Sequence, residues 1–207
     1  MVNLDALRGA ARHLSDVMAL NRDRLIELDQ KNGDGDLGIS MADGYKAVAT
    51  CLDSLEEGDL GKILMKCSGA FNAAAPSTLG TLTSVWFMGM AKALKGRTEA
   101  GLPELAEAME AGLRVVMEKA GSKPGEKTIL DALWPAVQDL KAHAGEPAAA
   151  AFAHAARAAE AGSESTRAMR SVHGRAAYYG DQSIGVLDGG SVAGALVFRA
   201  LADHLQG

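Results

Sequence analysis

Three aspartates lie close together in the first fifth of the chain. Asp34 and Asp36 flank a single glycine, and Asp29 precedes them at the end of an apolar-periodic stretch. Glycines before, between and after these aspartates let the backbone fold back closely enough for all three carboxylates to converge. Converged carboxylates repel one another strongly, and a hard multivalent cation is the usual remedy. The segment therefore predicts a Mg²⁺ site formed by Asp29, Asp34 and Asp36, with phosphate oxygens completing the coordination.

Two other interpretations of this segment stay open. Asn-Gly-Asp-Gly is good turn chemistry, so the segment could be a solvated acidic turn, although a turn explains neither the third carboxylate nor the apolar residues that follow. An EF-hand-like calcium loop would instead use Asn32, Asp34, Asp36, Ile39 and Asp43. That loop requires a glycine where this chain has Leu37, and a bidentate glutamate where it has Asp43.

The elements that must position these side chains are predicted to be helices. Apolar residues recur at helical spacing over 4–28, with Asn3 as a candidate N-cap and a break at residues 31–33. The same periodicity predicts helices over 41–52, 60–71, 79–94, 103–117, 129–140, an Ala-rich segment after Pro147, and 191–205, with an irregular stretch over 173–188. Period-two runs of β-branched residues are missing, and the loops are short. We therefore expect an all-α fold, an up-and-down antiparallel bundle of eight helices.

Composition bounds the class of protein. The 207 residues suit one domain, 1–207, and 48% hydrophobic residues exclude wholesale disorder. With 21 Lys+Arg against 26 Asp+Glu, the net charge of −5 argues against nucleic-acid or anionic-membrane binding. Cys51 and Cys67 lack metal spacing, and the five histidines are scattered, so we assign them no role. Without an apolar leader or a run of roughly 18 apolar residues, we expect a cytoplasmic protein.

Three segments carry a further pattern. Residues 28–41 hold the aspartates in the form L-D…G-D-G-D…G-x-x-M, residues 123–133 read K-P-G-E-K-T-I-L-D-A-L, and residues 174–185 read G-R-A-A-Y-Y-G-D-Q-S-I-G. In these segments, in this order, the chain resembles the nucleotide-binding L subunit, or the equivalent C-terminal domain, of dihydroxyacetone kinases. The family patterns are K-P-G-D-K-T-M-x-D-A-L for the second segment and G-R-A-S-Y-L-G-E-R-S-I-G for the third.

The resemblance implies a barrel of eight antiparallel helices with the nucleotide, ADP or ATP, at one end. It implies that Asp29, Asp34 and Asp36 hold two Mg²⁺ ions that bridge the phosphates. The nucleotide contacts that it implies are Leu37, Gly38, Ile39 and Ser40 along the phosphates, Thr78 and Leu79 in a second phosphate loop, Gly121 and Ile129 near the base, and Arg175, Asp188, Gly189 and Gly190. From the residues alone, Ile129 also fits a core position, Arg175 a surface charge and Asp188 a helix cap.

The resemblance also implies a kinase activity and a partner. In the family, a separate K subunit or domain holds dihydroxyacetone, or a related hydroxyketone or sugar, through a covalent bond to histidine. This chain is expected to supply nucleotide and metal to such a K subunit. ADP could stay bound and be recharged by a phosphotransferase-system protein, or ATP could exchange, and a homodimer stays open. The alternative is a Mg–nucleotide sensor or regulator without turnover.

The chain departs from the family pattern around the nucleotide. Leu37 stands where the family has histidine, and Asp43 replaces a common arginine. The second phosphate loop, residues 77–82, lacks the S-G-P-L form, and residues 186–189 replace H-x-D-P. We therefore expect the metal ligands to be kept and the details of phosphate recognition to differ, with the substrate open.

Overall fold

The computed structural model describes residues 1–56 and 58–207, and the regular elements in these residues are helices. They are α1 (Leu4–Leu20), α2 (Arg22–Asp29), α3 (Leu37–Asp53), α4 (Leu60–Ala74), α5 (Thr78–Ala93), α6 (Leu102–Ala120), α7 (Leu130–Ala142), α8 (Ala148–Ser165), the 3₁₀ helices η1 (Thr166–Ala168) and η2 (Arg175–Ser183), and α9 (Gly189–His204). The β-structure in the described part of the chain is one isolated bridge between Val2 and Ala100. The expected all-α class is confirmed.

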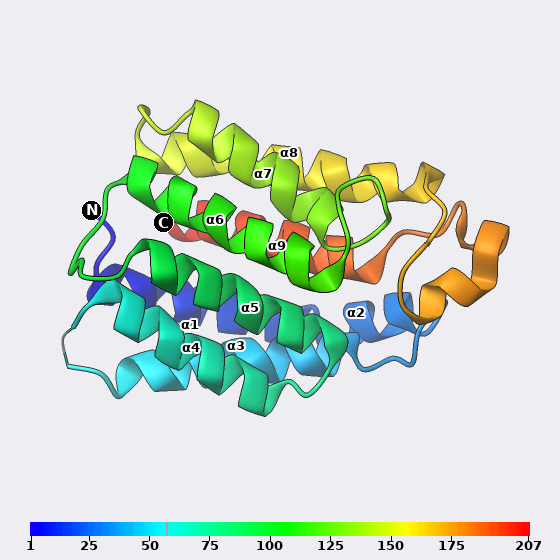
Figure 1. Cartoon of the computed structure of the whole chain (residues 1–207), viewed down its shortest axis with the longest axis horizontal. Coiled ribbons are helices and arrows are strands. Elements are labelled where there is room, and N and C mark those ends of the chain that lie inside the picture. Colours follow the sequence, from blue (N-terminus) through cyan, green and yellow to red (C-terminus); the bar gives the residue numbers. More distant parts are fainter. Residues whose placement is uncertain (57) are drawn as a thin grey trace.

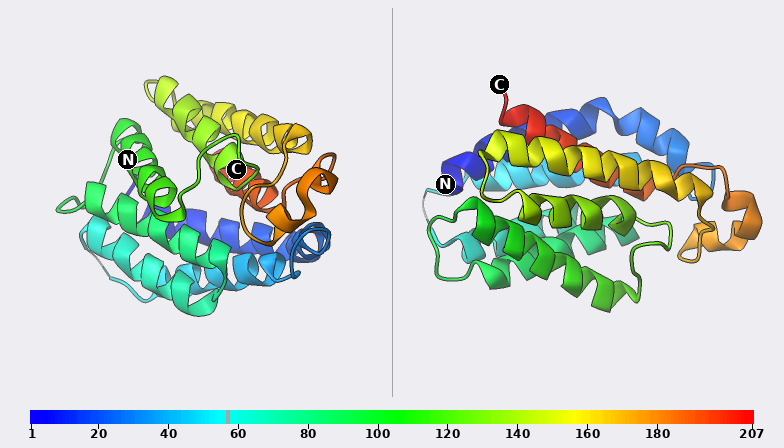
Figure 2. Two further views of the ribbon diagram at one scale, coloured as in Figure 1. Left: turned by 45° about the vertical axis from the view of Figure 1, so that its right-hand side comes forward. Right: turned by 90° about the horizontal axis from the view of Figure 1, so that it is seen from above.

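The helices form a closed ring. Helix α1 packs on α3, each helix from α3 to α8 packs on its successor, and α9 packs back on α1. Figures 1 and 2 show these eight helices running alternately up and down, with α2 continuing α1 at one end. The predicted eight-helix antiparallel barrel is therefore confirmed, because α1 and α2 together take the place of one predicted helix.

The prediction of a single helix over 4–28 was wrong in one respect. The helix breaks at Asn21, whose φ of −96° and ψ of 6° leave the helical region. The Asn21 side-chain Nδ2 donates a hydrogen bond to the Val17 carbonyl at 2.9 Å. A side-chain amide that bonds to the preceding turn competes with the helical ladder and bends it. The predicted N-cap is present, since Asn3 Oδ1 accepts a hydrogen bond from the Ala6 N–H at 3.0 Å.

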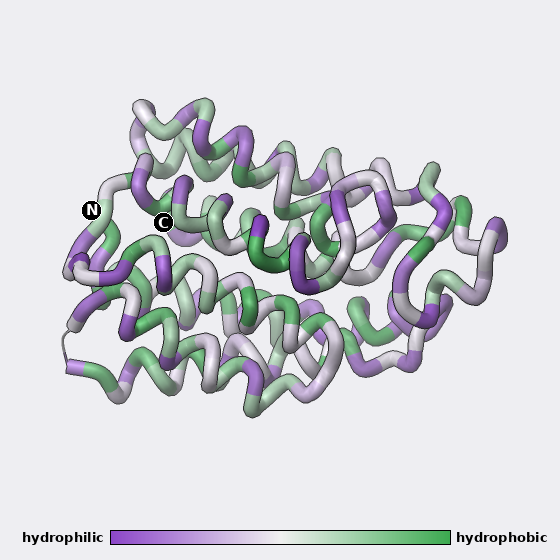
Figure 3. Tube along the Cα trace, viewed as in Figure 1, coloured by the Kyte–Doolittle hydropathy of each residue, from purple (hydrophilic) through white to green (hydrophobic). Residues whose placement is uncertain are grey.

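The interior of the barrel is apolar. Figure 3 shows hydrophobic and hydrophilic residues alternating along the helices, as expected when one face of each helix is buried. Tyr45 meets Phe71 edge-on, with ring centroids 5.1 Å apart, and Trp86 Nε1 donates to the Met109 carbonyl at 3.0 Å. The ring encloses a cavity of about 280 Å³ lined mainly by apolar side chains. None of the helices in residues 1–56 and 58–207 is both long enough and apolar enough to cross a membrane.

The two ends of the barrel differ. Both chain termini lie at one end (Figure 1). At the other end lie the α2–α3 loop, the start of α5, the α6–α7 loop, the segment with η1 and η2, and the start of α9. Figure 2 shows η2 projecting past the ends of the barrel helices next to α2. Every segment to which the sequence assigns a site residue is therefore at this second end.

Candidate functional site

The loop between α2 and α3 brings the three aspartates together. One carboxylate oxygen from each of Asp29, Asp34 and Asp36 lies within 4.8 Å of the other two. Asp29 is the last residue of α2 and is half-buried, whereas Asp34 and Asp36 lie in the loop and are exposed. Three oxygen donors at this spacing, open to solvent on one side, fit a hard divalent cation that also binds ligand oxygens.

Glycine makes this convergence possible. The Gly35 N–H donates to Asp29 Oδ2 at 2.7 Å, and Gly35 has a φ of +80°, a conformation that favours glycine. A Cβ at Gly33 would lie only 2.2 Å from Asp29 Oδ1. The loop thus wraps around the Asp29 carboxylate and fixes its orientation through the backbone.

The three carboxylates of the site lie beside one positively charged side chain, that of Arg175. Partial burial is the largest cause that raises the pKa of Asp36, and repulsion from the charges of Asp34 and Asp29 raises it further. The charge of Arg175 lowers this pKa. Arg175 Nη2 lies 2.8 Å from Asp34 Oδ2, so the segment with η2 reaches across to the trio. A divalent cation would favour the ionised form of all three carboxylates, which is why this donor set fits Mg²⁺.

The calcium-loop interpretation is wrong. Helix α3 already begins at Leu37, in the middle of the loop that an EF-hand would need. Ile39 and Asp43 are consequently helical, and the ligand group that the structure assembles in this region contains Asp29, Asp34 and Asp36 without Asp43.

The first turn of α3 follows the trio directly. Residues 37–40 form this turn, and the Ser40 N–H donates to the Asp36 carbonyl at 2.9 Å. The backbone N–H groups of residues 37–39 precede this first hydrogen bond of the helix, and the helix dipole there favours anions. The Leu37 side chain is buried, and a Cβ at Gly189 would lie 2.7 Å from its Cδ2. Of the predicted phosphate-lining residues, Gly38 and Ser40 are buried and Ile39 is exposed. Leu37 can therefore offer its backbone to a phosphate while its side chain packs in the core.

The start of α9 lies between the α2–α3 loop and α7. Asp188 caps α9, with its Oδ2 accepting a hydrogen bond from the Ser191 N–H at 2.6 Å. Burial raises the pKa of Asp188 to about 7, against the Ser191 bond and the charge of Lys127. Gly189 faces Leu37, and a Cβ at Gly190 would lie 3.4 Å from the Ile129 backbone nitrogen. The capping interpretation of Asp188 is thus confirmed, and the glycines allow α9 to approach both neighbours closely.

The other predicted contacts are placed around this end without converging as tightly. Thr78 opens α5 and is exposed, and Leu79 follows it half-buried. Gly121 ends α6 in the left-handed region with φ 58°, and the space around its Cβ position is open. Ile129 is 7% exposed and belongs to the core cluster, as the periodicity indicates.

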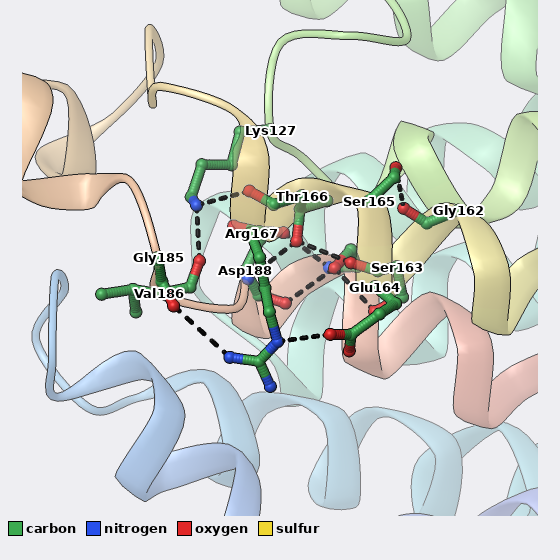
Figure 4. A network of polar contacts seen from close by, with 11 residues as sticks. Lys127, Gly162, Ser163, Glu164, Ser165, Thr166, Arg167, Gly185, Val186 and Asp188 are labelled. Carbon is green, nitrogen blue, oxygen red and sulfur yellow. Dashed lines mark hydrogen bonds and ion pairs between the residues drawn. The ribbon is translucent and has the colours of Figure 1, made fainter.

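Lys127, in the α6–α7 loop, is a residue at this end of the barrel to which the sequence gives no role. The residue is 4% exposed, and its Nζ lies within hydrogen-bond distance of four backbone carbonyls, those of Thr166, Met169, Ser183 and Val186. Figure 4 shows this lysine reaching from the α6–α7 loop to both ends of the segment that carries η2. The matched family pattern contains this lysine, but acceptors that are backbone carbonyls leave no signal in the sequence.

Comparison with known proteins decides the family. The model of the DAK2 domain matches residues 31–203, most of the chain and every segment of the site except Asp29. The chain belongs to the DAK2 domain family. Its relatives include the PEP-dependent dihydroxyacetone kinase 1, ADP-binding subunit DhaL, of Listeria innocua, which is 32% identical over 181 residues covering 87% of this chain and 86% of that protein.

Other relatives carry the DAK2 domain within longer chains. A triokinase/FMN cyclase of Rattus norvegicus is 32% identical over 187 residues, or 89% of this chain and 32% of that protein. The chain thus spans about a third of the length of these relatives. Among solved structures, the dihydroxyacetone kinase from C. freundii in complex with AMP-PNP and Mg²⁺ superposes with a TM-score of 0.78 at 25% identity, over 98% of this chain and 34% of that one.

Proposed function

We propose that this DAK2 domain binds Mg²⁺ and ADP or ATP at Asp29, Asp34 and Asp36, and takes part in phosphoryl transfer to dihydroxyacetone or a related hydroxyketone or sugar. The observation that carries the proposal is the convergence of these three carboxylates at the loop end of the barrel. A relative named as an ADP-binding subunit and a similar structure with AMP-PNP and Mg²⁺ support the choice of ligand.

The chain's own residues would hold and orient the ligand. Asp29, fixed by the Gly35 N–H, and the more exposed Asp34 and Asp36 would hold two Mg²⁺ ions. Bound Mg²⁺ would neutralise the phosphates and the charge that spreads over the transferring group, which is where most catalysis of this reaction arises. Backbone N–H groups of residues 37–39 and of Thr78 and Leu79, each at a helix N-terminus, would donate hydrogen bonds to phosphate oxygens, and the Ser40 hydroxyl would add a further donor.

The Arg175 guanidinium can pair either with the Asp34 carboxylate or with a phosphate of the nucleotide. Its Nη2 lies 2.8 Å from Asp34 Oδ2. Once a cation engages the Asp34 carboxylate, the guanidinium would be free to pair with a phosphate, to which its forked donors are well matched. Gly121 and Ile129 would frame the base, and Asp188, Gly189 and Gly190 would close the site from the α9 side.

We propose that the acceptor substrate is held by a partner. The Listeria relative is named as a subunit of a dihydroxyacetone kinase, which supports a K subunit that binds the substrate covalently and presents it to the nucleotide. The Listeria relative is named PEP-dependent, so a phosphoprotein that receives its phosphoryl group from PEP is a candidate donor to bound ADP, with exchange of ATP as the other route.

Titration calorimetry with ADP, with and without Mg²⁺, tests the metal assignment. Asp34→Asn should abolish Mg²⁺-dependent ADP binding and leave helicity intact, because it removes one negative ligand from the trio. Asp203→Asn is the matched control, since Asp203 is exposed near the C-terminal end of α9, at the other end of the barrel and outside the ligand group. Unchanged ADP affinity in Asp34→Asn would contradict the assignment.

A second candidate function is a Mg–nucleotide sensor without turnover. The buried Leu37 side chain favours it, because the polar side chain that the family pattern has there is absent from the phosphate site. Phosphoryl transfer measured with a co-expressed substrate-binding subunit separates the two functions: turnover eliminates the sensor, and nucleotide binding without turnover supports it.

A further inference from the structure

The ammonium group of Lys127 lies in a cage of carbonyl oxygens. The distances from Nζ are 2.7 Å to Thr166 O, 3.2 Å to Met169 O, 2.9 Å to Ser183 O and 2.5 Å to Val186 O. An ammonium has three N–H donors, so four acceptors exceed what directional hydrogen bonds require. Backbone carbonyls that surround an unhydrated charge are how proteins bind monovalent cations such as K⁺. The four carbonyl oxygens therefore resemble the ligands of a monovalent-cation site, and the Lys127 ammonium occupies the position of the cation.

The surroundings of Lys127 indicate that this contact is costly to form. Lysine is almost never buried unless it is paired, yet Lys127 is 4% exposed. Its backbone φ of 59° is the one positive value among non-glycine residues in the described part of the chain. A left-handed backbone is unfavourable for a residue with a Cβ and persists only where its surroundings enforce it. Both features point to a specific role for the charged group.

The cage joins the two ends of one segment. Thr166 and Met169 lie before η2, and Ser183 and Val186 lie at its end and beyond. Between them is Arg175, which reaches Asp34 of the trio. Thr166 also accepts a hydrogen bond from the Asp188 N–H through Oγ1 at 3.1 Å, so the same network continues to the cap of α9 (Figure 4). The two ends are also joined directly, by the Gly185 N–H to the Arg167 carbonyl at 2.7 Å and the Ser171 N–H to Ser183 Oγ at 2.9 Å. The Lys127 charge adds four carbonyl contacts to this closure and ties the segment to the α6–α7 loop.

We propose that the Lys127 ammonium is a built-in monovalent cation that positions the Arg175 segment over the aspartate trio, and that K⁺ or NH₄⁺ can replace it when the side chain is removed. Lys127 is a positioning residue, because it acts on Arg175 and Asp188 through the backbone of residues 166–186. The link to nucleotide rests on the proposed function, whereas the fastening of the segment does not.

The test compares two variants that differ in the space they leave. Lys127→Gly permits the positive φ and empties the cage, whereas Lys127→Met removes the charge but keeps most of the volume. Amide hydrogen exchange of residues 166–186, measured without nucleotide, should rise by about tenfold or more in both, because buried carbonyls lose a charged donor. Ammonium or potassium chloride should restore slow exchange in Lys127→Gly and not in Lys127→Met, with sodium chloride at equal ionic strength as the salt control.

Lys123→Met is the matched control for the loss of charge. Lys123 is exposed in the same loop, so its substitution should leave the exchange of residues 166–186 unchanged. Unchanged exchange in both Lys127 variants, or equal restoration of both by every salt, would overturn the proposal. If the variants do not fold, the unaltered protein still decides, because a caged ammonium should give slowly exchanging ¹⁵N–H₃⁺ signals, and fast exchange of that group would overturn the proposal.

Calorimetry with Mg²⁺–ADP then separates this proposal from the proposed function. Lys127→Gly should bind Mg²⁺–ADP about tenfold more weakly than the unaltered protein and regain affinity with NH₄⁺. Failure of the unaltered protein to bind Mg²⁺–ADP would count against the proposed function, and the exchange experiment would still decide the role of Lys127. Loosened exchange with undiminished ADP affinity would overturn the positioning of Arg175.

Discussion

The carboxylate of Asp29 is oriented by backbone groups of the loop that follows it. The Gly35 N–H binds one oxygen, and the missing side chain of Gly33 leaves room for the other. The convergence of the three aspartates could be predicted from the sequence, because glycines before, between and after them let the loop fold back. The way in which the loop holds Asp29 could not, since it depends on contacts of less than 3 Å between backbone and side chain.

Gly33→Ala should weaken Mg²⁺–ADP binding while the protein stays folded. The new Cβ would lie 2.2 Å from Asp29 Oδ1, so the carboxylate must rotate away from Asp34 and Asp36. We expect a loss of about tenfold or more in affinity by calorimetry, since one of three charged ligands is displaced. Gly145→Ala, at a position with open space in a loop at the other end, is the control and should bind as the unaltered protein does. Equal affinities for all three proteins would show that Asp29 is not a ligand.

Asp188 makes the stability of the nucleotide-free, metal-free protein depend on pH. Its pKa in the folded state, about 7, is above the ordinary value of 3.8, so folding favours the protonated form. The stabilisation is present at acid pH and is lost as the pH rises through about 7. Asp188→Asn keeps a capping side chain but cannot ionise. Melting temperatures at about pH 5 and about pH 8 should differ less in Asp188→Asn than in the unaltered protein. The same difference in both would contradict the burial of this carboxyl group.

At the scale of elements, apolar periodicity was sufficient to predict where the helices lie. It was insufficient at the site, where α3 begins at Leu37, several residues before its periodicity becomes clear, and the N-terminal helix breaks at Asn21. Both features place Asp29 beside Asp34 and Asp36. The early start of α3 accompanies its close approach to α2 at Gly38, a tertiary contact that a one-dimensional pattern does not contain. The break at Asn21 comes with a local side-chain bond to the Val17 carbonyl, which apolar periodicity does not register either.

Replacement of glycine by alanine should lower stability at Gly38 on α3 and raise it at Gly69 on α4. A Cβ at Gly38 would lie 2.1 Å from the Arg22 carbonyl oxygen, so Gly38→Ala forces α2 away from α3. We expect a loss of about 1–3 kcal/mol in the free energy of unfolding. Gly69 is exposed on α4 with open space around it, and Gly69→Ala should add up to about 1 kcal/mol through helix propensity. Urea denaturation of both variants measures this, and a stabilised Gly38→Ala would contradict the close approach of α2 and α3.

At the scale of the whole molecule, the site exists because the ring closes. Its segments extend from Asp29 at the end of α2 to Gly190 in α9, and they meet because α9 packs back on α1 and α2. Periodicity and loop length predicted antiparallel neighbours but gave no reason for helices distant in sequence to pair. The closed barrel followed from the resemblance of three motifs to a family, and the structure supplies its physical basis in the contact of α9 with α1.

A ligand that binds segments from both halves of the ring should stabilise the whole barrel. We expect Mg²⁺–ADP at about 100 times Kd to raise the free energy of unfolding by about 2.7 kcal/mol. The barrel should then unfold in a single cooperative transition at a higher temperature. Chelation of the metal with EDTA should remove the shift, because the ADP phosphates would then face three unneutralised carboxylates. Differential scanning calorimetry with ADP alone, Mg²⁺ alone and both together measures this. An equal shift with ADP in EDTA would mean that the nucleotide binds away from the trio, and a transition that splits in two on binding would mean that it engages only one half of the ring.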